Sequence, residues 1–164
     1  RIGWLFGIAA SALGIALFLH QQVYAQVALN AIYVGMGAYG WWSWGRGQGA
    51  ELPIVRRGGR FHALVIAAGL VGTVVLALAL RLVPGAQHVA MDGFATAFSL
   101  LATWMLARKV LENWAYWIVA DAVAIALYAM LDLWWYVGLY AIYVGLSTSA
   151  LRRWHRQWRA AQGP

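Results

Sequence analysis

The sequence contains no cysteine, and only five of its 164 residues are Asp or Glu. Without cysteine, both disulfide bonds and thiolate-ligated metal sites are excluded. Charged residues of both signs make up 10% of the chain, whereas soluble domains carry about a quarter. This shortage of charge argues against a soluble globular domain.

Long stretches without any Asp, Glu, Lys or Arg cover residues 2–19, 63–80 and 133–151. Each is long enough to cross about 30 Å of hydrocarbon as a helix. We therefore predict an all-α polytopic membrane protein. Its six membrane segments are expected at 2–20, 23–44, 61–81, 89–107, 113–131 and 133–152.

The distribution of basic residues predicts how the chain is oriented. With six crossings, only Arg81 lies on one side of the membrane. The other side holds Arg1, Arg46, Arg56, Arg57, Arg60, Arg108, Lys109, Arg152, Arg153, Arg156 and Arg159. Because cytoplasmic loops are enriched in Lys and Arg, we predict that this side and the C-terminus are cytoplasmic. The net charge of +7 is then a topology signal, and we expect no nucleic-acid partner.

The pentapeptide AIYVG occurs at 31–35 and again at 141–145, which indicates an internal duplication. With a shift of 110 residues, identities continue on both sides of it. They include Trp4 with Trp114, Ile8 with Ile118, IAL at 15–17 with IAL at 125–127, Val27 with Val137, Leu29 with Leu139 and Trp44 with Trp154. The first and fifth segments run in the same direction, so the duplication predicts parallel repeats, as in SWEET-type transporters.

The duplication also predicts a domain plan. We expect one transmembrane transporter domain over 1–164, with 2–44 as an incomplete first repeat, 61–81 as a connector helix and 89–152 as the second repeat. The segment at 89–107 precedes the second copy, but nothing corresponds to it before Trp4. The complete plan is three helices, a connector and three helices, so we expect one helix to be missing here.

Asp121 is the only carboxylate near the middle of a predicted membrane segment. An ionisable group at that depth costs roughly 2.5–3.5 kcal/mol on insertion scales and points to a functional site. The alternative is that neighbouring Tyr, Trp or Asn side chains hydrogen-bond it, or that it stays protonated. The functional interpretation makes Asp121 a polar anchor beside the substrate path.

Aromatic residues share a helix face with this carboxylate. Trp114, Trp117, Asp121, Ile125 and Tyr128 recur at helical spacing. Such a face suits a planar, cationic or hydrogen-bonding ligand, through stacking and cation–π attraction. The alternative is that the tryptophans belong to an aromatic belt at the membrane interface.

Other helix faces add weaker candidates. A polar stripe of Thr96, Ser99 and Thr103 follows Asp92 on the fourth segment, and it either bonds neighbouring helices or lines a passage. The predicted substrate-binding residues are Asn30, Tyr33, Trp41, Asn113, Trp114, Trp117, Asp121, Tyr140 and Tyr143. Of these, the tryptophans at 114 and 117 are expected to stack on or gate against an aromatic ring.

Signals for an enzyme are poor. The four histidines lie at segment ends and far apart in sequence, and no nucleophile or phosphate-loop motif is present. We therefore predict no catalytic residues, no metal and no cofactor.

Two segments carry a family resemblance. ENWAYWIVADAVAIALY (112–128) fits the pattern N-W-x-x-W-x-x-x-D-x-x-x-I-x-L-Y, and NAIYVGMGAYGWWSW (30–44) fits N-x-x-Y…Y-G-W-x-x-W. The chain thereby resembles the Pnu vitamin-transporter family, whose best-known branch is the PnuC nicotinamide riboside transporters. The resemblance implies a SWEET-like seven-helix fold in the bacterial inner membrane. It also implies uptake by facilitated diffusion, with phosphorylation by a cytoplasmic kinase as the metabolic trap.

The resemblance leaves the cargo open. Nicotinamide riboside is the leading expectation, and thiamine or riboflavin uptake by the same fold is the alternative. A non-transporting membrane scaffold or sensor is the rival from another class, and a membrane enzyme comes third. Besides the vitamin and the lipid bilayer, the expected partners are the kinase, through a functional link, and further copies of the chain in a homo-oligomer.

Overall fold

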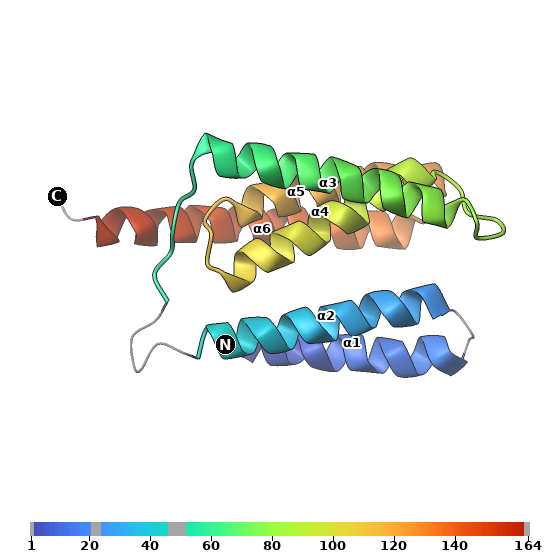
Figure 1. Cartoon of the computed structure of the whole chain (residues 1–164), viewed down its shortest axis with the longest axis horizontal. Helices are drawn as coiled ribbons and strands as arrows, with labels where there is room; N and C mark the ends of the chain where they lie inside the picture. The colour runs from blue at the N-terminus through green and yellow to red at the C-terminus, as the bar shows by residue number, and fades with distance from the viewer. Residues whose placement is uncertain (1, 21–23, 46–51, 163–164) are drawn as a thin grey trace. The chain divides into compact units, whose positions relative to one another are not determined.

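The computed structural model describes residues 2–20, 24–45 and 52–162, and its regular structure in these ranges is helical. Arg1, Arg46 and the loop residues 46–51, which entered the predicted charge distribution, lie outside the described residues. The helices are α1 (Ile2–His20), α2 (Tyr24–Ser43), α3 (Gly59–Leu80), α4 (Val89–Ala107), α5 (Asn113–Met130) and α6 (Trp134–Ala161) (Figure 1). The predicted all-α class is confirmed.

Membrane-spanning capacity differs among the described helices. By length and hydropathy α3, α4 and α5 can each cross a bilayer, and α1 holds a shorter apolar run, Ile2–Leu17. In contrast, α2 and α6 contain many Gly, Tyr and Trp residues, which rank low on hydropathy scales. Aromatic residues of this kind are common near membrane interfaces.

The helix that carries the predicted sixth membrane segment, 133–152, extends beyond that segment. Helix α6 continues to Ala161 through RRWHRQWRAA. Arg, Gln and Ala are good helix formers, so the helix persists although its hydrophobic stretch has ended. A hydropathy criterion detects the apolar part of such a helix and misses its polar extension.

The chain divides into two compact units. The first comprises 1–53 with 106–109, and the second comprises 54–105 with 110–164. In the first unit, α1 and α2 lie side by side and pack through small residues. A Cβ atom at Gly40 would lie 2.5 Å from the Trp4 ring, and one at Gly37 would lie 2.7 Å from Ile8. Only glycine therefore permits this close approach of the two helices.

Residues 106–109 pack with the end of α2. The Ala107 carbonyl accepts hydrogen bonds from the Ser43 hydroxyl and the Trp44 indole, both at 3.2 Å. Lys109 is buried, and its ammonium lies 4.9 Å from the centre of the Trp44 ring. These contacts satisfy one of the carbonyls that a helix C-terminus leaves without a helical partner.

In the second unit, α3 packs closely on α4. A Cβ atom at Gly69 would lie 2.6 Å from the Phe98 ring, and one at Gly93 would lie 2.9 Å from the Thr73 carbonyl. One core cluster joins Val65, Met105 and Val110, and a second joins Ala97, Phe98 and Ala120. Leu111 N–H donates to the Val55 carbonyl at 2.8 Å, which fastens the segment before α3 to the start of α5.

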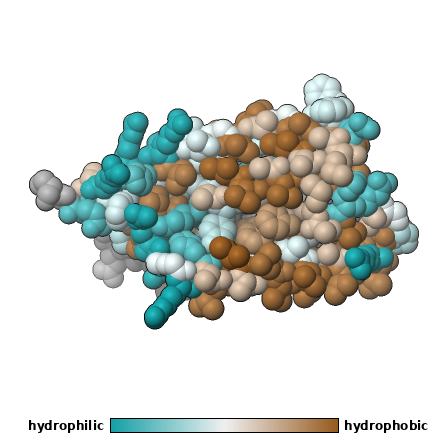
Figure 2. All heavy atoms as spheres, turned by 90° about the horizontal axis from the view of Figure 1, so that it is seen from above, coloured by the Kyte–Doolittle hydropathy of each residue, from teal (hydrophilic) through white to brown (hydrophobic). Residues whose placement is uncertain are grey.

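The outward side of α3 is apolar. Leu64, Leu70, Val71, Val74, Val75 and Leu78 are all more than half exposed. Figure 2 shows brown, hydrophobic side chains spread over this face, with hydrophilic side chains gathered towards the end where α6 terminates. This pattern is what a helix in contact with lipid requires.

Candidate functional site

Helix α5 carries most of the predicted site. Its sequence, NWAYWIVADAVAIALYAM, has no glycine or proline and is rich in alanine, which favours helix. Glu112 precedes the first helical residue, where a carboxylate interacts favourably with the positive end of the helix dipole. The helix therefore displays its side chains on a regular and rigid frame.

Three predicted residues on α5 each carry a buried polar atom. Asn113 is fully buried, and its amide N–H donates to the Val110 carbonyl at 2.6 Å. Asp121 is 2% exposed. Asn113 Oδ1, Trp114 Nε1 and Asp121 Oδ2 are buried without a hydrogen-bond partner within the described part of the chain. Burying such an atom costs free energy unless a further group binds it. The part of these residues in substrate binding stays a prediction.

Trp114 is held in a fixed orientation by α6. Its ring meets that of Trp154 edge to face, with centroids 5.3 Å apart. This is a favoured geometry for aromatic pairs. Trp117, one turn further along α5, is partly buried. The structure thus places both tryptophans on the helix that carries Asp121.

Tyrosines continue the aromatic face towards the other end of α5. The Tyr128 ring stacks on Tyr136 at 4.9 Å and on Tyr140 at 5.3 Å. Tyr140 in turn meets Tyr143 edge to face at 5.6 Å. Two predicted path-lining residues, Tyr140 and Tyr143, are therefore brought into one aromatic cluster with Tyr128, which we call the tyrosine cluster.

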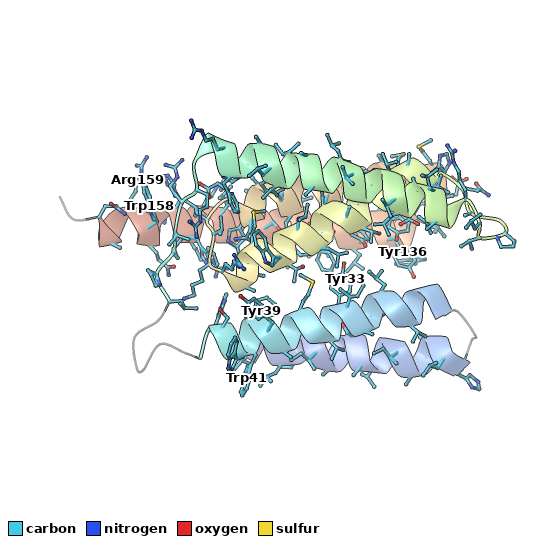
Figure 3. All side chains as sticks on the ribbon, in the orientation of Figure 1. Tyr33, Tyr39, Trp41, Tyr136, Trp158 and Arg159 are labelled. Carbon is cyan, nitrogen blue, oxygen red and sulfur yellow. The ribbon has the colours of Figure 1, made fainter. Side chains whose placement is uncertain are left out.

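The remaining predicted residues belong to the first unit. Asn30, Tyr33 and Trp41 all lie on α2, and Figure 3 labels the last two. Asn30 packs against Gly14 of α1, where a Cβ atom would lie 2.6 Å from its side-chain oxygen. Tyr33 is partly buried and Trp41 is 42% exposed. Their part in substrate binding stays a prediction.

The polar stripe on α4 is engaged within its own helix. The Thr103 hydroxyl donates to the Ser99 carbonyl at 2.8 Å, and the Thr96 side chain bonds to Asp92. The bond from Thr103 to a backbone carbonyl one turn earlier satisfies its hydroxyl locally.

One polar cluster was not predicted. Arg56 Nε donates to Glu112 Oε1 at 3.2 Å, and His62 Nδ1 and the Tyr116 hydroxyl are hydrogen-bonded at 3.0 Å. The residues come from three separate segments, so sequence spacing gave no signal for it. Within the described ranges, no three His, Asp or Glu side chains are placed to hold a metal ion.

Comparison with known proteins gives the family. The family model described as nicotinamide mononucleotide transporter matches residues 1–156. The chain belongs to this family. This membership confirms the resemblance drawn from the α2 and α5 motifs, and the family is one of transporters.

Individual members of the transporter family are distant in sequence. The chain is 22% identical to the nicotinamide riboside transporter PnuC of Escherichia coli (strain K12), over 92% of this chain and 74% of that one. It is 26% identical to the riboflavin/roseoflavin transporter RibM of Streptomyces davaonensis, over 86% of this chain and 70% of that one. The crystal structure of the vitamin B3 transporter PnuC superposes with a TM-score of 0.72 at 25% identity, covering 96% and 72% of the two chains.

Proposed function

We propose that this protein takes up nicotinamide riboside across the bacterial inner membrane by facilitated diffusion, with phosphorylation by a cytoplasmic kinase retaining the product. The observation that supports this most directly is the buried Asp121 carboxylate, whose Oδ2 has no partner among the described residues. The nicotinamide ring of the riboside is a planar cation. A carboxylate in a low-dielectric site compensates such a charge.

The surroundings of Asp121 favour an aromatic cation over other cations. Trp114 and Trp117 precede Asp121 on the same helix, and the tyrosine cluster follows it. Tryptophan and tyrosine faces attract cations and stack on planar rings. The expected roles are ring stacking by Trp117 and Trp114, and polar contacts from Asn113, Asp121 and Asn30.

Charge also favours the riboside over its phosphorylated form. Helices α1, α2, α4 and α5 contain no Lys or Arg, so no basic side chain on them can compensate a phosphate within the membrane. A phosphate beside Asp121 would instead meet a like charge. We therefore expect the mononucleotide to be excluded, even though the family model bears its name.

Transport in a defined system tests the proposal. Purified protein in liposomes should let labelled nicotinamide riboside equilibrate, and accumulation should require a kinase and ATP enclosed in the liposomes. Accumulation above the outside concentration in kinase-free liposomes with a sodium or proton gradient would contradict facilitated diffusion.

Riboflavin is the second candidate cargo, because a riboflavin transporter is among the relatives. Its ring system is planar but carries no fixed cation, so stacking would support it and Asp121 would contribute less. Competition of labelled nicotinamide riboside by unlabelled riboflavin, thiamine and the mononucleotide separates these cargoes. Strong competition by riboflavin alone would favour the second candidate.

A further inference from the structure

Three tyrosine rings stack where α5 ends and α6 begins. Tyr128 lies in the last turn of α5, and its ring is stacked on those of Tyr136 and Tyr140 at interplanar angles of 21° and 25°. Tyr136 lies in the first turn of α6, and Tyr140 follows it by four residues on the same helix face. We call these three residues the tyrosine stack.

A carboxylate from a third helix lies beside the tyrosine stack. Asp92, in the first turn of α4, is close enough to Tyr128 for the two side chains to interact electrostatically. It accepts a hydrogen bond from Thr96. Within the described ranges, no basic side chain forms an ion pair with Asp92. The negative charge of this carboxylate therefore has no counter-charge in the part of the chain that the structure describes.

The aromatic rings and the carboxylate are accessible from one end of the helices. Tyr136 is 49% exposed, and Asp92 is partly exposed. Figure 3 labels Tyr136 at the opposite end of α6 from Trp158 and Arg159, which follow the predicted cytoplasmic end of the sixth segment. The tyrosine stack and Asp92 thus lie at the end that the sequence predicts to face the outside.

This arrangement is distinct from the carboxylate of the proposed substrate site but in line with it. Tyr128 follows Asp121 by seven residues, so the two side chains share a face of α5 and lie about 10 Å apart along the helix axis. A single pyridine ring cannot contact residues so far apart. The two carboxylates, Asp92 and Asp121, therefore belong to two successive positions on one path.

The chemistry of the outer position selects for a ring that carries a positive charge. A tyrosine face stacks on planar rings and attracts cations. A carboxylate without a counter-charge adds Coulomb attraction for the same cation. A neutral ring gains the stacking alone, and a cation without a ring gains the charge interaction alone.

We propose that Asp92 and the exposed face of Tyr136 form an outer binding site for planar aromatic cations, where the cargo is captured before it moves to Asp121. The identity of the cargo rests on the proposed function, whereas the ligand class follows from the tyrosine stack and Asp92. A site lined by one sign of charge raises the local concentration of ligands of the opposite sign. An outer site therefore increases uptake mainly when cargo is scarce.

Equilibrium dialysis of the purified full chain tests the outer site without any transport step. The probes are labelled 1-methylnicotinamide, a planar cation, and nicotinamide, its neutral analogue. In the Asp121→Asn variant, which lacks the inner charge, the cation should bind about fivefold tighter than nicotinamide. Combining Asp121→Asn with Asp92→Asn should abolish that preference. No preference in Asp121→Asn alone, or an undiminished preference in the double variant, would overturn the proposal.

A matched control separates the site from a general charge effect. Asp132 is exposed and lies between α5 and α6, at the same end of the molecule. Asp132→Asn, combined with Asp121→Asn, should leave the preference for the cation unchanged. Equal losses with Asp132→Asn and Asp92→Asn would show that net charge at this end attracts the cation, and the site at Asp92 would be rejected.

The aromatic part of the outer site has its own test. In the Asp121→Asn background, Tyr136→Ala should weaken binding of 1-methylnicotinamide about threefold, whereas Tyr136→Phe should keep it. Since Tyr136 is half exposed, both variants are expected to fold even if the Asp92 substitution does not. Unchanged binding in the alanine variant would contradict stacking on this ring.

Uptake into liposomes separates failure of this inference from failure of the proposed function. Asp92→Asn should lower uptake of labelled nicotinamide riboside about fivefold at limiting concentration and less than about twofold at saturation. Unchanged uptake at limiting concentration would remove Asp92 from the path. Absence of uptake by the wild type would contradict the proposed function, and the dialysis result would still decide whether the outer site exists.

Discussion

Trp114 of α5 and Trp154 of α6 meet edge to face, with an interplanar angle of 87°. Trp4 and Trp44, each 110 positions earlier, make the same contact at 89°, with centroids 5.6 Å apart. Each pair lies within one unit. The shared geometry supports the proposed duplication, because chance similarity between apolar sequences gives no reason for the same ring contact at the same spacing.

The tryptophan pair predicts a stability change. Trp154→Ala should lower the free energy of unfolding by about 2 kcal/mol, since it removes the ring contact and buried apolar area. Trp154→Phe should keep most of that stability. Thermal unfolding in detergent measures both, with Trp135→Ala as the control because Trp135 is 93% exposed. Equal losses at 154 and 135 would mean that the edge-to-face contact contributes nothing.

The close approach of α1 and α2 predicts opposite effects at two glycines of one helix. Gly40→Ala should destabilise by about 1–3 kcal/mol, because its methyl group would overlap the Trp4 ring. Gly35→Ala should instead stabilise by up to about 1 kcal/mol, since a Cβ there meets nothing within 4 Å. Unfolding temperatures of the two variants decide. A stable Gly40→Ala protein would contradict the tight contact.

The buried carboxylate predicts a cargo-dependent loss of transport. Asp121→Asn keeps the shape of the side chain but removes its charge, so uptake of nicotinamide riboside should fall roughly 10–100-fold. Any riboflavin uptake should fall much less. Asp132→Asn is the control, because Asp132 is exposed and its left-handed backbone (φ 56°) suits asparagine. Wild-type uptake by a well-expressed Asp121→Asn variant would remove Asp121 from the proposed site.

The tyrosine cluster predicts a difference between ring and hydroxyl. Tyr128→Ala should lose two stacking contacts and lower the free energy of unfolding by about 1–3 kcal/mol. Tyr128→Phe keeps both stacks and should remain close to wild type in stability. Uptake and thermal unfolding measured on the same preparations separate folding from transport. If the phenylalanine variant lost as much stability as the alanine variant, the hydroxyl would be the important group.

Helix positions were accessible from the sequence because charge and hydropathy change sharply at most helix ends. The bounds 2–20 and 89–107 agree with α1 and α4. The C-terminal end of α6 could not be predicted from the same charge and hydropathy pattern. Its last ten residues mix Arg with Trp and Ala, and such a composition gives no apolar signal although it forms a stable helix.

The sequence could predict which site residues share a face only where those residues lie on one helix. Trp114, Trp117 and Asp121 lie on successive turns of the same helix, so their common face follows from helix geometry. The contact between His62 and Tyr116 joins residues 54 positions apart. It depends on how α3 packs beside α5, which no local pattern in the sequence encodes.

The extension of α6 has a mechanical consequence. At one end of its apolar stretch stand Trp134 and Trp135, and at the other stand Arg152 and Arg153. If 133–152 spans the membrane, as the sequence predicts, sliding the helix along the membrane normal would draw either the arginines into hydrocarbon or the tryptophans away from the interface, and both are costly. Rotation about its own axis or a change in tilt avoids both costs. Any movement of α6 during transport is therefore expected to be a rotation about its own axis or a change in tilt, and not a translation along the membrane normal.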